Sequence, residues 1–437
     1  MIKSIKISLQ YLFRYKKQQN MKTKCKIKSI KYFAFISVFC LVSISSQAQS
    51  LNTFLQKAVE NNTELKSLLL QYEAELKRAD QQDQLQNPTI GVGVPILRPE
   101  TRLGAQILMI NASQMFPWFG TLKAKKDVVL QMSKAKYERI SAKKLQIFYK
   151  IKTAYYQLVF LNTEEEIIKN YIKIYSSLES FSLAKIESGQ TTSADALRIN
   201  IKLQALKQEL LLIANRKRIF EIIINKETKE DLETRISAEE NTLVFESEMD
   251  LNKYKEKIQN HPLIAKLNKE FEVSQQKQKL NNKKGLPTIG LGLDYSLVNK
   301  RTDANPMYNG NDILIPKLSV SIPIYRKAYK AKNEEEKLVQ QSLEMQKEDL
   351  IDNIISQLMQ YQLEYNNALL ETELTLKQIK TNNMVYEVLL AKYSSQGKGF
   401  DELLQIQNQI ISFELKLEKS KLKKRIALAG IEMLTEY

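Results

Sequence analysis

The sequence predicts a mainly α-helical chain with long antiparallel helical hairpins and a small β part that enters a membrane. The first observation behind this fold class is where the helix breakers fall. Eight of the nine prolines and eight of the twelve glycines lie within residues 88–120 and 285–323. Neither residue type occurs in the 68 positions of 121–188 or in the 73 positions of 324–396. At 1.5 Å rise per residue, each of these intervals can form a helix of roughly 100 Å.

The second observation is an internal repeat. Residues 88–94 match residues 287–293 at five of seven positions, with an offset of 199. Farther along, Ala184-Lys185 matches Ala391-Lys392 with an offset of 207. A repeat of this length indicates the duplication of a domain-sized unit and not a solenoid of short repeats.

The third observation is an N-terminal leader. Five lysines within residues 22–31 precede an apolar run at 32–44, and the small residues of 46–48 suit a cleavage site. Residues 1–48 are therefore interpreted as an N-terminal extension and signal peptide. The apolar run is too short for a membrane-spanning helix, and no later run is longer. If the chain enters a membrane, it is expected to do so with strands.

Charge and cysteine content narrow the function classes. The net charge is +17, but residues 1–48 hold ten Lys or Arg and no acid, which leaves +7 for the rest. The remaining lysines alternate with acids along the expected helices, as on solvated helix faces, so no nucleic-acid partner is predicted. Cys25 and Cys40 both lie in the leader, which excludes disulfides and Cys-ligated metals from the remainder. A lipid anchor at Cys40 is the less favoured alternative to cleavage.

Alternating residues predict the strands. Apolar residues alternate with small or polar ones in 89–96 and again in 288–297. Each half is expected to form one β-hairpin, at 88–116 and 287–324, whose strands of about ten residues suit a transmembrane β-strand. Four strands cannot close a barrel, and lipid does not tolerate an open sheet edge, so several chains would pool their strands. The alternative is that these hairpins cap a soluble helical domain.

The helical part is expected to consist of two hairpins whose turns lie far from the strands. Between residues 147 and 175, apolar residues recur in steps of four and three, with Glu165 the one polar member. This 3.5-residue spacing is typical of helices packed side by side over a long length, which an ordinary antiparallel coiled coil also shows. In chain order, the expected helices span 63–86, 120–187, 194–228, 262–283, 325–395 and 400–434.

No constellation of catalytic residues stands out. The single histidine, His261, precedes Pro262 at a helix start, where a capping role is the favoured interpretation. The sequence holds no Ser/His/Asp set, glycine-rich phosphate loop or His/Glu metal spacing, and the methionines are scattered. We therefore expect no enzymatic activity, no cofactor and no resident metal.

Several short motifs in this order resemble those of the TolC family of outer-membrane channel proteins. They are Asn87-Pro88, the stretch SQMFPWFG at 113–120, and Gly189 followed by SADAL at 193–197, within a layout that occurs twice. The resemblance covers about residues 50–437. The sequence of residues 113–120 is most similar to that of family members that work with resistance-nodulation-division pumps for cations or drugs.

The resemblance implies two TolC-like repeats, 49–260 and 261–437, with an equatorial segment at 229–260. It also implies a homotrimer in which three chains form a 12-stranded β-barrel in the outer membrane of a Gram-negative bacterium, with outer-membrane lipid around it. Twelve helices would form a trimeric α-barrel, and most of the chain would lie in the periplasm. The implied partners are a periplasmic adaptor (membrane fusion) protein and an inner-membrane resistance-nodulation-division or other pump. The chain would be the passive exit duct for small molecules or metal cations.

The same resemblance indicates two sets of site residues. The hairpin tips would contact the adaptor and gate the tunnel, and the barrel would join the tunnel at a second set. Asp195 and Glu402 occupy equivalent places in the two repeats, and helix capping explains them equally well. The aromatic residues at the junction suit either an interfacial belt or core packing. The tip set is Gly189, Thr192, Asp195, Tyr393, Gly397 and Glu402, and the junction set is Phe116, Pro117, Trp118, Gly120 and Pro323.

Two other functions stay open at this point. A type 1 protein-secretion conduit has the same fold and differs only in its partners. A periplasmic coiled-coil scaffold or adaptor protein would use the hairpins as soluble caps. An adaptor is expected to have one helical hairpin flanked by all-β domains, whereas this sequence predicts two hairpins and four strands.

Overall fold

The computed structural model describes residues 50–97, 99–187, 193–239, 254, 257–396 and 399–436. The leader predicted for 1–48 and residues 240–253 of the expected equatorial segment lie outside the described residues. Contacts divide the chain into two units. The smaller comprises Met1–Ser50 with Ser237–Glu239, and the larger comprises Leu51–Ile236 with Glu240–Tyr437. All the helices and strands given below belong to the larger unit.

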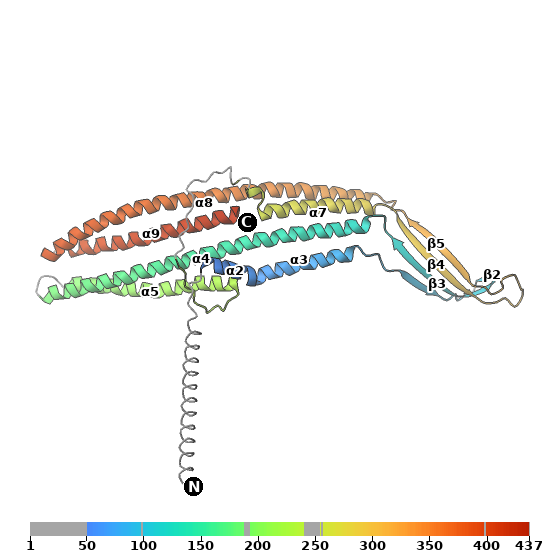
Figure 1. Ribbon diagram of the computed structural model, residues 1–437, viewed down its shortest axis with the longest axis horizontal. Coiled ribbons are helices and arrows are strands. Elements are labelled where there is room, and N and C mark those ends of the chain that lie inside the picture. The colour runs from blue at the N-terminus through green and yellow to red at the C-terminus, as the bar shows by residue number, and fades with distance from the viewer. Residues whose placement is uncertain are drawn as a thin grey trace, which may run out of the picture. The chain divides into compact units, whose positions relative to one another are not determined.

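The larger unit is mainly helical with a small antiparallel sheet, which confirms the predicted fold class at this level (Figure 1). Its two longest helices have 67 and 70 residues. The helices are α2 (Leu51–Asn61), α3 (Thr63–Gln82), α4 (Thr121–Glu187), α5 (Ser193–Thr228), α7 (Pro262–Lys284), α8 (Lys327–Gln396) and α9 (Phe400–Thr435). The strands are β1 (Thr89–Gly93), β2 (Glu100–Thr101), β3 (Gly104–Phe116), β4 (Thr288–Val298) and β5 (Ile313–Ser321).

The N-terminal helices differ from the expectation. A helix not predicted from the sequence, α2, precedes α3, and Asn62 separates the two by accepting hydrogen bonds from the backbone amides of Glu64 and Leu65. This is a helix N-cap, which satisfies amides that have no partner within the helix. The following helix ends at Gln82 and not at 86. Asp83 is the C-cap, and its carboxylate accepts from Lys126 of α4 at 2.7 Å.

The sheet has a fifth, two-residue strand, β2, where four strands were expected. It pairs with the start of β3 through a tight turn, in which the Thr101 hydroxyl donates to the Gly104 carbonyl at 2.8 Å. Gly104 has a φ of 133°, and a Cβ there would stand 1.7 Å from the carbonyl oxygen of Asn299. Only glycine fits this position, because the backbone conformation and the close approach both exclude a side chain.

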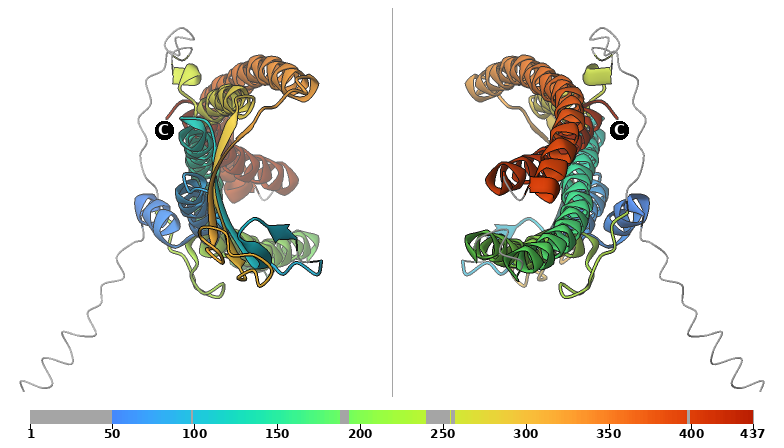
Figure 2. Two further views of the ribbon diagram at one scale, coloured as in Figure 1. Left: turned by 90° about the vertical axis from the view of Figure 1, so that its right-hand side faces the viewer. Right: turned by 90° about the vertical axis from the view of Figure 1, so that its left-hand side faces the viewer.

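Strands and helices continue one another in a single row. The strand order is β1-β3-β4-β5, and the helices attached to these strands contact in the same order, α3-α4-α7-α8. Farther from the sheet, α5 replaces α3 beside α4, and α9 replaces α7 between α4 and α8. Viewed end-on, these helices lie along an open arc (Figure 2). Apart from α2, which packs on α4 and α5, the unit is therefore a curved wall one layer thick, with an open edge on each side.

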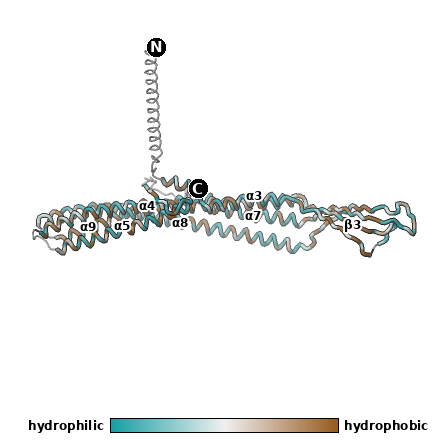
Figure 3. The backbone as a smooth tube through the Cα atoms, turned by 90° about the horizontal axis from the view of Figure 1, so that it is seen from below, coloured by the Kyte–Doolittle hydropathy of each residue, from teal (hydrophilic) through white to brown (hydrophobic). Residues whose placement is uncertain are grey.

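The helices pack through the predicted apolar stripe. Glu165, its polar member, forms ion pairs with Lys169 and Lys217 at the edge of the packed surface. Hydrophobic and hydrophilic residues alternate along the helices (Figure 3), and no helix in the described ranges is long and apolar enough to cross a membrane. The buried members of the stripe are Ile147, Ile151, Ala154, Leu158, Leu161, Ile168 and Tyr175.

Candidate functional site

The sheet separates two kinds of side chain onto its two faces. Residues paired directly across neighbouring strands project from the same face, and the next pair along projects from the other. One row across the four main strands consists of Ile90, Ala112, Leu293 and Pro316, and the next row consists of Gly91, Asn111, Asp294 and Ile315. The register therefore gives the sheet one apolar face and one face of small and polar residues.

The apolar face is exposed in the single chain. Ile90 is 70% exposed, Leu318 is 72% exposed and Val320 is 55% exposed. On the opposite face, Lys317 forms an ion pair with Asp294. Soluble proteins seldom leave an apolar surface of several strands uncovered, so this face is built to contact lipid or another protein.

Both edges of the sheet are open. β1 and β5 each pair on one side only, so each has a row of backbone groups without partners from this chain's sheet. Edge strands of this kind are templates for pairing with another chain. Pro316 lies in β5, as expected for an edge strand, because proline has no amide hydrogen to donate to a ladder.

The predicted junction residues lie where β3 gives way to α4. Trp118 closes the turn by accepting a hydrogen bond from the Thr121 amide at 3.0 Å, and Gly120 has a φ of 80°. The Trp118 and Phe119 ring centroids are 6.2 Å apart, and Phe119 is 80% exposed. A pocket of about 420 Å³ opens here, and the structure brings four of the five predicted residues to it. Its lining is Leu85, Phe116, Pro117, Trp118, Phe119, Gly120, Leu122, Ile289 and Leu291. The fifth predicted residue, Pro323, follows β5 and is half-buried.

The far ends of the two helical hairpins pack against each other. Gly189, Thr192 and Gly397 of the predicted tip set lie outside the described residues. Tyr393 is fully buried, with its ring 5.9 Å from that of Phe181.

Lys185 joins the first hairpin to the second. From α4, its ammonium lies 4.7 Å from the centre of the Tyr393 ring and donates to the Tyr393 carbonyl at 2.8 Å. A second hydrogen bond goes to the Ser394 carbonyl at 3.3 Å. Lys185 is buried, which makes such charge-assisted bonds stronger than they would be in water.

The two tip carboxylates lie near the N-terminal ends of α5 and α9. Glu402 accepts from Lys392 at 3.3 Å, within the second hairpin, while Asp195 lies half-buried in the first turn of α5. The N-cap of α9 is Gly399, which has no side chain to accept a capping bond. Near the tips, Asp401 links the two hairpins through an ion pair with Arg198 of α5.

The interpretation of the tips from the sequence did not include the residues that join the hairpins, namely Phe181, Lys185, Arg198 and Asp401. For Lys185 a signal existed, because Lys392 occupies the equivalent place in the second repeat. Arg198 and Asp401 are 203 residues apart and are not repeat equivalents, so nothing local in the sequence connects them.

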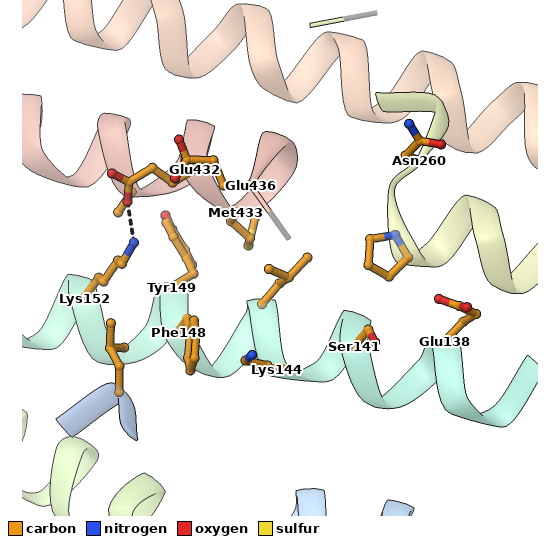
Figure 4. Close-up of a pocket in the computed structure, with 14 residues that line it drawn as sticks. Glu138, Ser141, Lys144, Phe148, Tyr149, Lys152, Asn260, Glu432, Met433 and Glu436 are labelled. Atoms are coloured by element: carbon orange, nitrogen blue, oxygen red, sulfur yellow. Dashed lines mark hydrogen bonds and ion pairs between the residues drawn. The ribbon is translucent and has the colours of Figure 1, made fainter. Parts of the chain in front are cut away.

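A cavity of about 530 Å³ lies where α4 meets the start of α7 and the end of α9 (Figure 4). Lys152 and Glu432 form an ion pair of 2.5 Å on its wall. Nearby, His261 is buried and caps α7, because its Nδ1 accepts from the Leu263 amide at 3.2 Å. Among the described residues, no group of three or more His, Cys, Asp or Glu could hold a metal ion.

The chain shares its fold with solved outer-membrane channels. No family model and no curated protein sequence matches it. CusC, whose structures concern transmembrane channel formation, is 12% identical with a TM-score of 0.72, covering 89% of this chain and 92% of that one. The outer membrane channel CmeC of Campylobacter jejuni is 12% identical with a TM-score of 0.69, covering 88% and 85%. The outer membrane channel MtrE of Neisseria gonorrhoeae, in an open state, is 15% identical with a TM-score of 0.67, covering 90% and 93%.

Proposed function

We propose that this chain, which has the fold of outer-membrane channels, is a TolC-family channel and serves as the passive exit duct of a tripartite efflux system. The observation that carries the proposal is the one-layer wall whose sheet has an exposed apolar face and two open edges. In a membrane, that face would contact lipid, and the open edges would need partners because lipid offers no hydrogen bonds.

Copies of the same chain would supply those partners. One edge of the wall is formed by α3 and α5 and the other by α8. Both α5 and α8 carry exposed apolar residues along their length. When the α5 edge of one copy packs on the α8 edge of the next, the contact is head-to-tail and closes into a ring. Three copies would combine four long strands each into a 12-stranded barrel. The exposed apolar residues are Leu197, Ile201, Leu211 and Ile219 on α5, and Leu363, Leu370, Met384 and Val388 on α8.

The proposed location and partners follow from the sheet and the hairpin tips lying at opposite ends of the long helices. The sheet would lie in the outer membrane of a Gram-negative bacterium, and helices of roughly 100 Å would extend into the periplasm. Their tips would meet a periplasmic adaptor, and through it an inner-membrane pump that supplies small molecules or metal cations. Lys185 and the Arg198–Asp401 pair join neighbouring hairpins at the tips, which supports a role in closing the duct there.

The test is the mass and location of the native particle. The outer-membrane fraction is solubilised in mild detergent, and the mass of the purified particle is measured. A particle of three chains in that fraction is the expected result. A monomer or dimer in the periplasmic fraction would refute the channel and favour a coiled-coil scaffold. The class of pump that co-purifies after crosslinking separates small-molecule efflux from type 1 protein secretion.

A further inference from the structure

The apolar pocket at the junction of β3 and α4 continues the apolar face of the sheet. Ile289 and Leu291 of β4 belong to both, so the lining runs without a break from the strands to the start of α4. The lining side chains are hydrocarbon or aromatic, and the indole of Trp118 is the one with a polar atom. A groove of this composition favours a hydrocarbon chain over a polar ligand.

Positive charge surrounds the pocket. Residues 121–127 of α4 and 279–284 of α7 together hold six lysines and a single acid, Asp127. Lys283 lies beside the pocket lining, since its Nζ lies 3.8 Å from where a Cβ of Gly120 would stand. Among the described residues, Lys283 forms no ion pair, and its side chain is exposed. Its charge is therefore available to a ligand in the pocket.

The nearby acids cancel only part of this charge, because Asp80, Asp83 and Asp127 offset three of the six lysines. Asp80 and Asp83, at the end of α3, are both held by Lys126, at 3.5 Å and 2.7 Å. The start of α8 adds further cations without an acid at 325–330, where Arg326, Lys327 and Lys330 occur. The helix ends beneath the sheet thus form a positive belt directly beside the apolar pocket.

Exposed aromatic rings lie at the same level. Phe119 is 80% exposed just before α4, and Tyr325 is 84% exposed just before α8. Aromatic rings at this position are typical of the boundary between hydrocarbon and water in membrane barrels. Apolar pocket, cations and aromatic rings together match the parts of one molecule, an acyl chain attached to a negatively charged headgroup.

We propose that this junction binds an anionic glycerophospholipid, with an acyl chain in the Trp118 pocket and the phosphate against Lys283. The inference rests on the proposed function, because it needs the sheet to lie in a membrane. Charge complementarity decides the headgroup. A zwitterionic lipid offers the same phosphate together with a cation that the lysine belt repels, whereas phosphatidylglycerol offers the negative charge alone.

Trp118 makes the test direct, because it is the only tryptophan of the chain and it lines the pocket. The full-length protein is purified from the membrane fraction and reconstituted with brominated phosphatidylglycerol or brominated phosphatidylcholine, whose bromines quench indole fluorescence on contact. Phosphatidylglycerol is expected to quench with an apparent affinity higher by roughly fivefold for each contacting lysine. Lys283→Gln should lower this preference by about that factor, and raising the salt concentration should lower it in the unsubstituted protein.

Lys380→Gln is the matched control. Lys380 is exposed on α8, forms no ion pair among the described residues and lies 53 residues beyond the start of that helix, about 80 Å away. Its substitution should leave the lipid preference unchanged. Circular dichroism and particle mass of both variants verify that each folds and assembles.

Flotation of the same vesicles separates the two proposals. Protein that does not float with the vesicles would refute the membrane channel itself. Protein that floats but is quenched equally by both lipids, or whose preference survives Lys283→Gln, would refute the anionic lipid site alone. Floating protein that neither lipid quenches would mean that a neighbouring copy covers the pocket, which also overturns the lipid site.

Discussion

At the scale of single residues, His261 couples helix capping to protonation. The neutral ring caps α7 because Nδ1 must accept the Leu263 amide, and the ring is 4% exposed. Burial lowers the pKa of His261 to about 4, an effect that a hydrogen bond to the Met433 backbone partly offsets. The protein therefore keeps this histidine uncharged over a range in which a solvated histidine takes up a proton.

This shift predicts acid sensitivity with a defined sign. Between the usual pKa of about 6.5 and the folded value of about 4, the unfolded chain binds more protons than the folded one. The free energy of unfolding is therefore unaffected by this histidine above about pH 6.5. It falls by up to roughly 3 kcal/mol as the pH is lowered to 4. His261→Asn keeps a capping acceptor and removes the titration, so its thermal unfolding should depend less on pH between 6.5 and 4. An equal loss of stability in both proteins would contradict this account.

In the proposed duct, substitution of Lys185 is expected to change gating. Lys185→Met keeps the apolar stem and removes the ammonium that bonds to the Tyr393 and Ser394 carbonyls. A charge-assisted hydrogen bond contributes about 1.5–3 kcal/mol, so the closed-to-open ratio in planar-bilayer recordings should fall by roughly tenfold or more. Lys392→Met is the control, because its ammonium is paired with Glu402 inside its own hairpin. Unchanged recordings for Lys185→Met, or equal changes in both variants, would exclude Lys185 from closure.

At the scale of elements, the proposed channel predicts which substitutions in strand β5 block membrane insertion. Leu318 projects from the exposed apolar face, whereas Ile315, three positions earlier, projects from the other face opposite Asp294. An arginine facing lipid near the midplane costs about 2–4 kcal/mol, whereas one facing the lumen does not. Leu318→Arg should lower the amount of assembled protein in the outer-membrane fraction, and Ile315→Arg should not. Equal losses would mean that the apolar face does not contact lipid.

The elements also differ in how far the sequence predicts them. The interval without proline or glycine predicts α4 closely, because the helix begins at Thr121, directly after Gly120, and only glycine readily takes the φ of 80° found there. β2 could not be predicted, since two residues have no periodicity and Gly104, with which Thr101 pairs, packs against the Asn299 carbonyl from a distant part of the sequence. The contacts at the tips could not be predicted from the local sequence either, because Arg198 and Asp401 meet only once four helices have packed.

At the scale of the whole molecule, the exposed residues of α8 predict how copies associate. Leu370 is 67% exposed on this edge helix, in a protein whose other long helix, α4, has neighbours on both sides. Leu370→Glu places a charge in the proposed contact between copies and should shift the particle from trimer to monomer without loss of helicity. Gln360→Glu adds the same charge at an exposed polar site of α8 and should leave the trimer intact. Light scattering in detergent measures both, and a trimeric Leu370→Glu particle would argue against contact at this residue.

The pairing of β3 with β4 has a consequence for how the protein is made. These strands are neighbours in space, yet β3 ends at Phe116 and β4 begins at Thr288, so the centre of the sheet cannot form until about two thirds of the chain has been synthesised. Until then, β1 and β3 form a two-stranded ribbon with an uncovered apolar face, and such intermediates aggregate. Even the finished sheet of the single chain has two open edges. For the proposed channel, we therefore expect holding chaperones to be needed during passage to the membrane, and their depletion should lower its yield before that of proteins whose sheets form from consecutive strands.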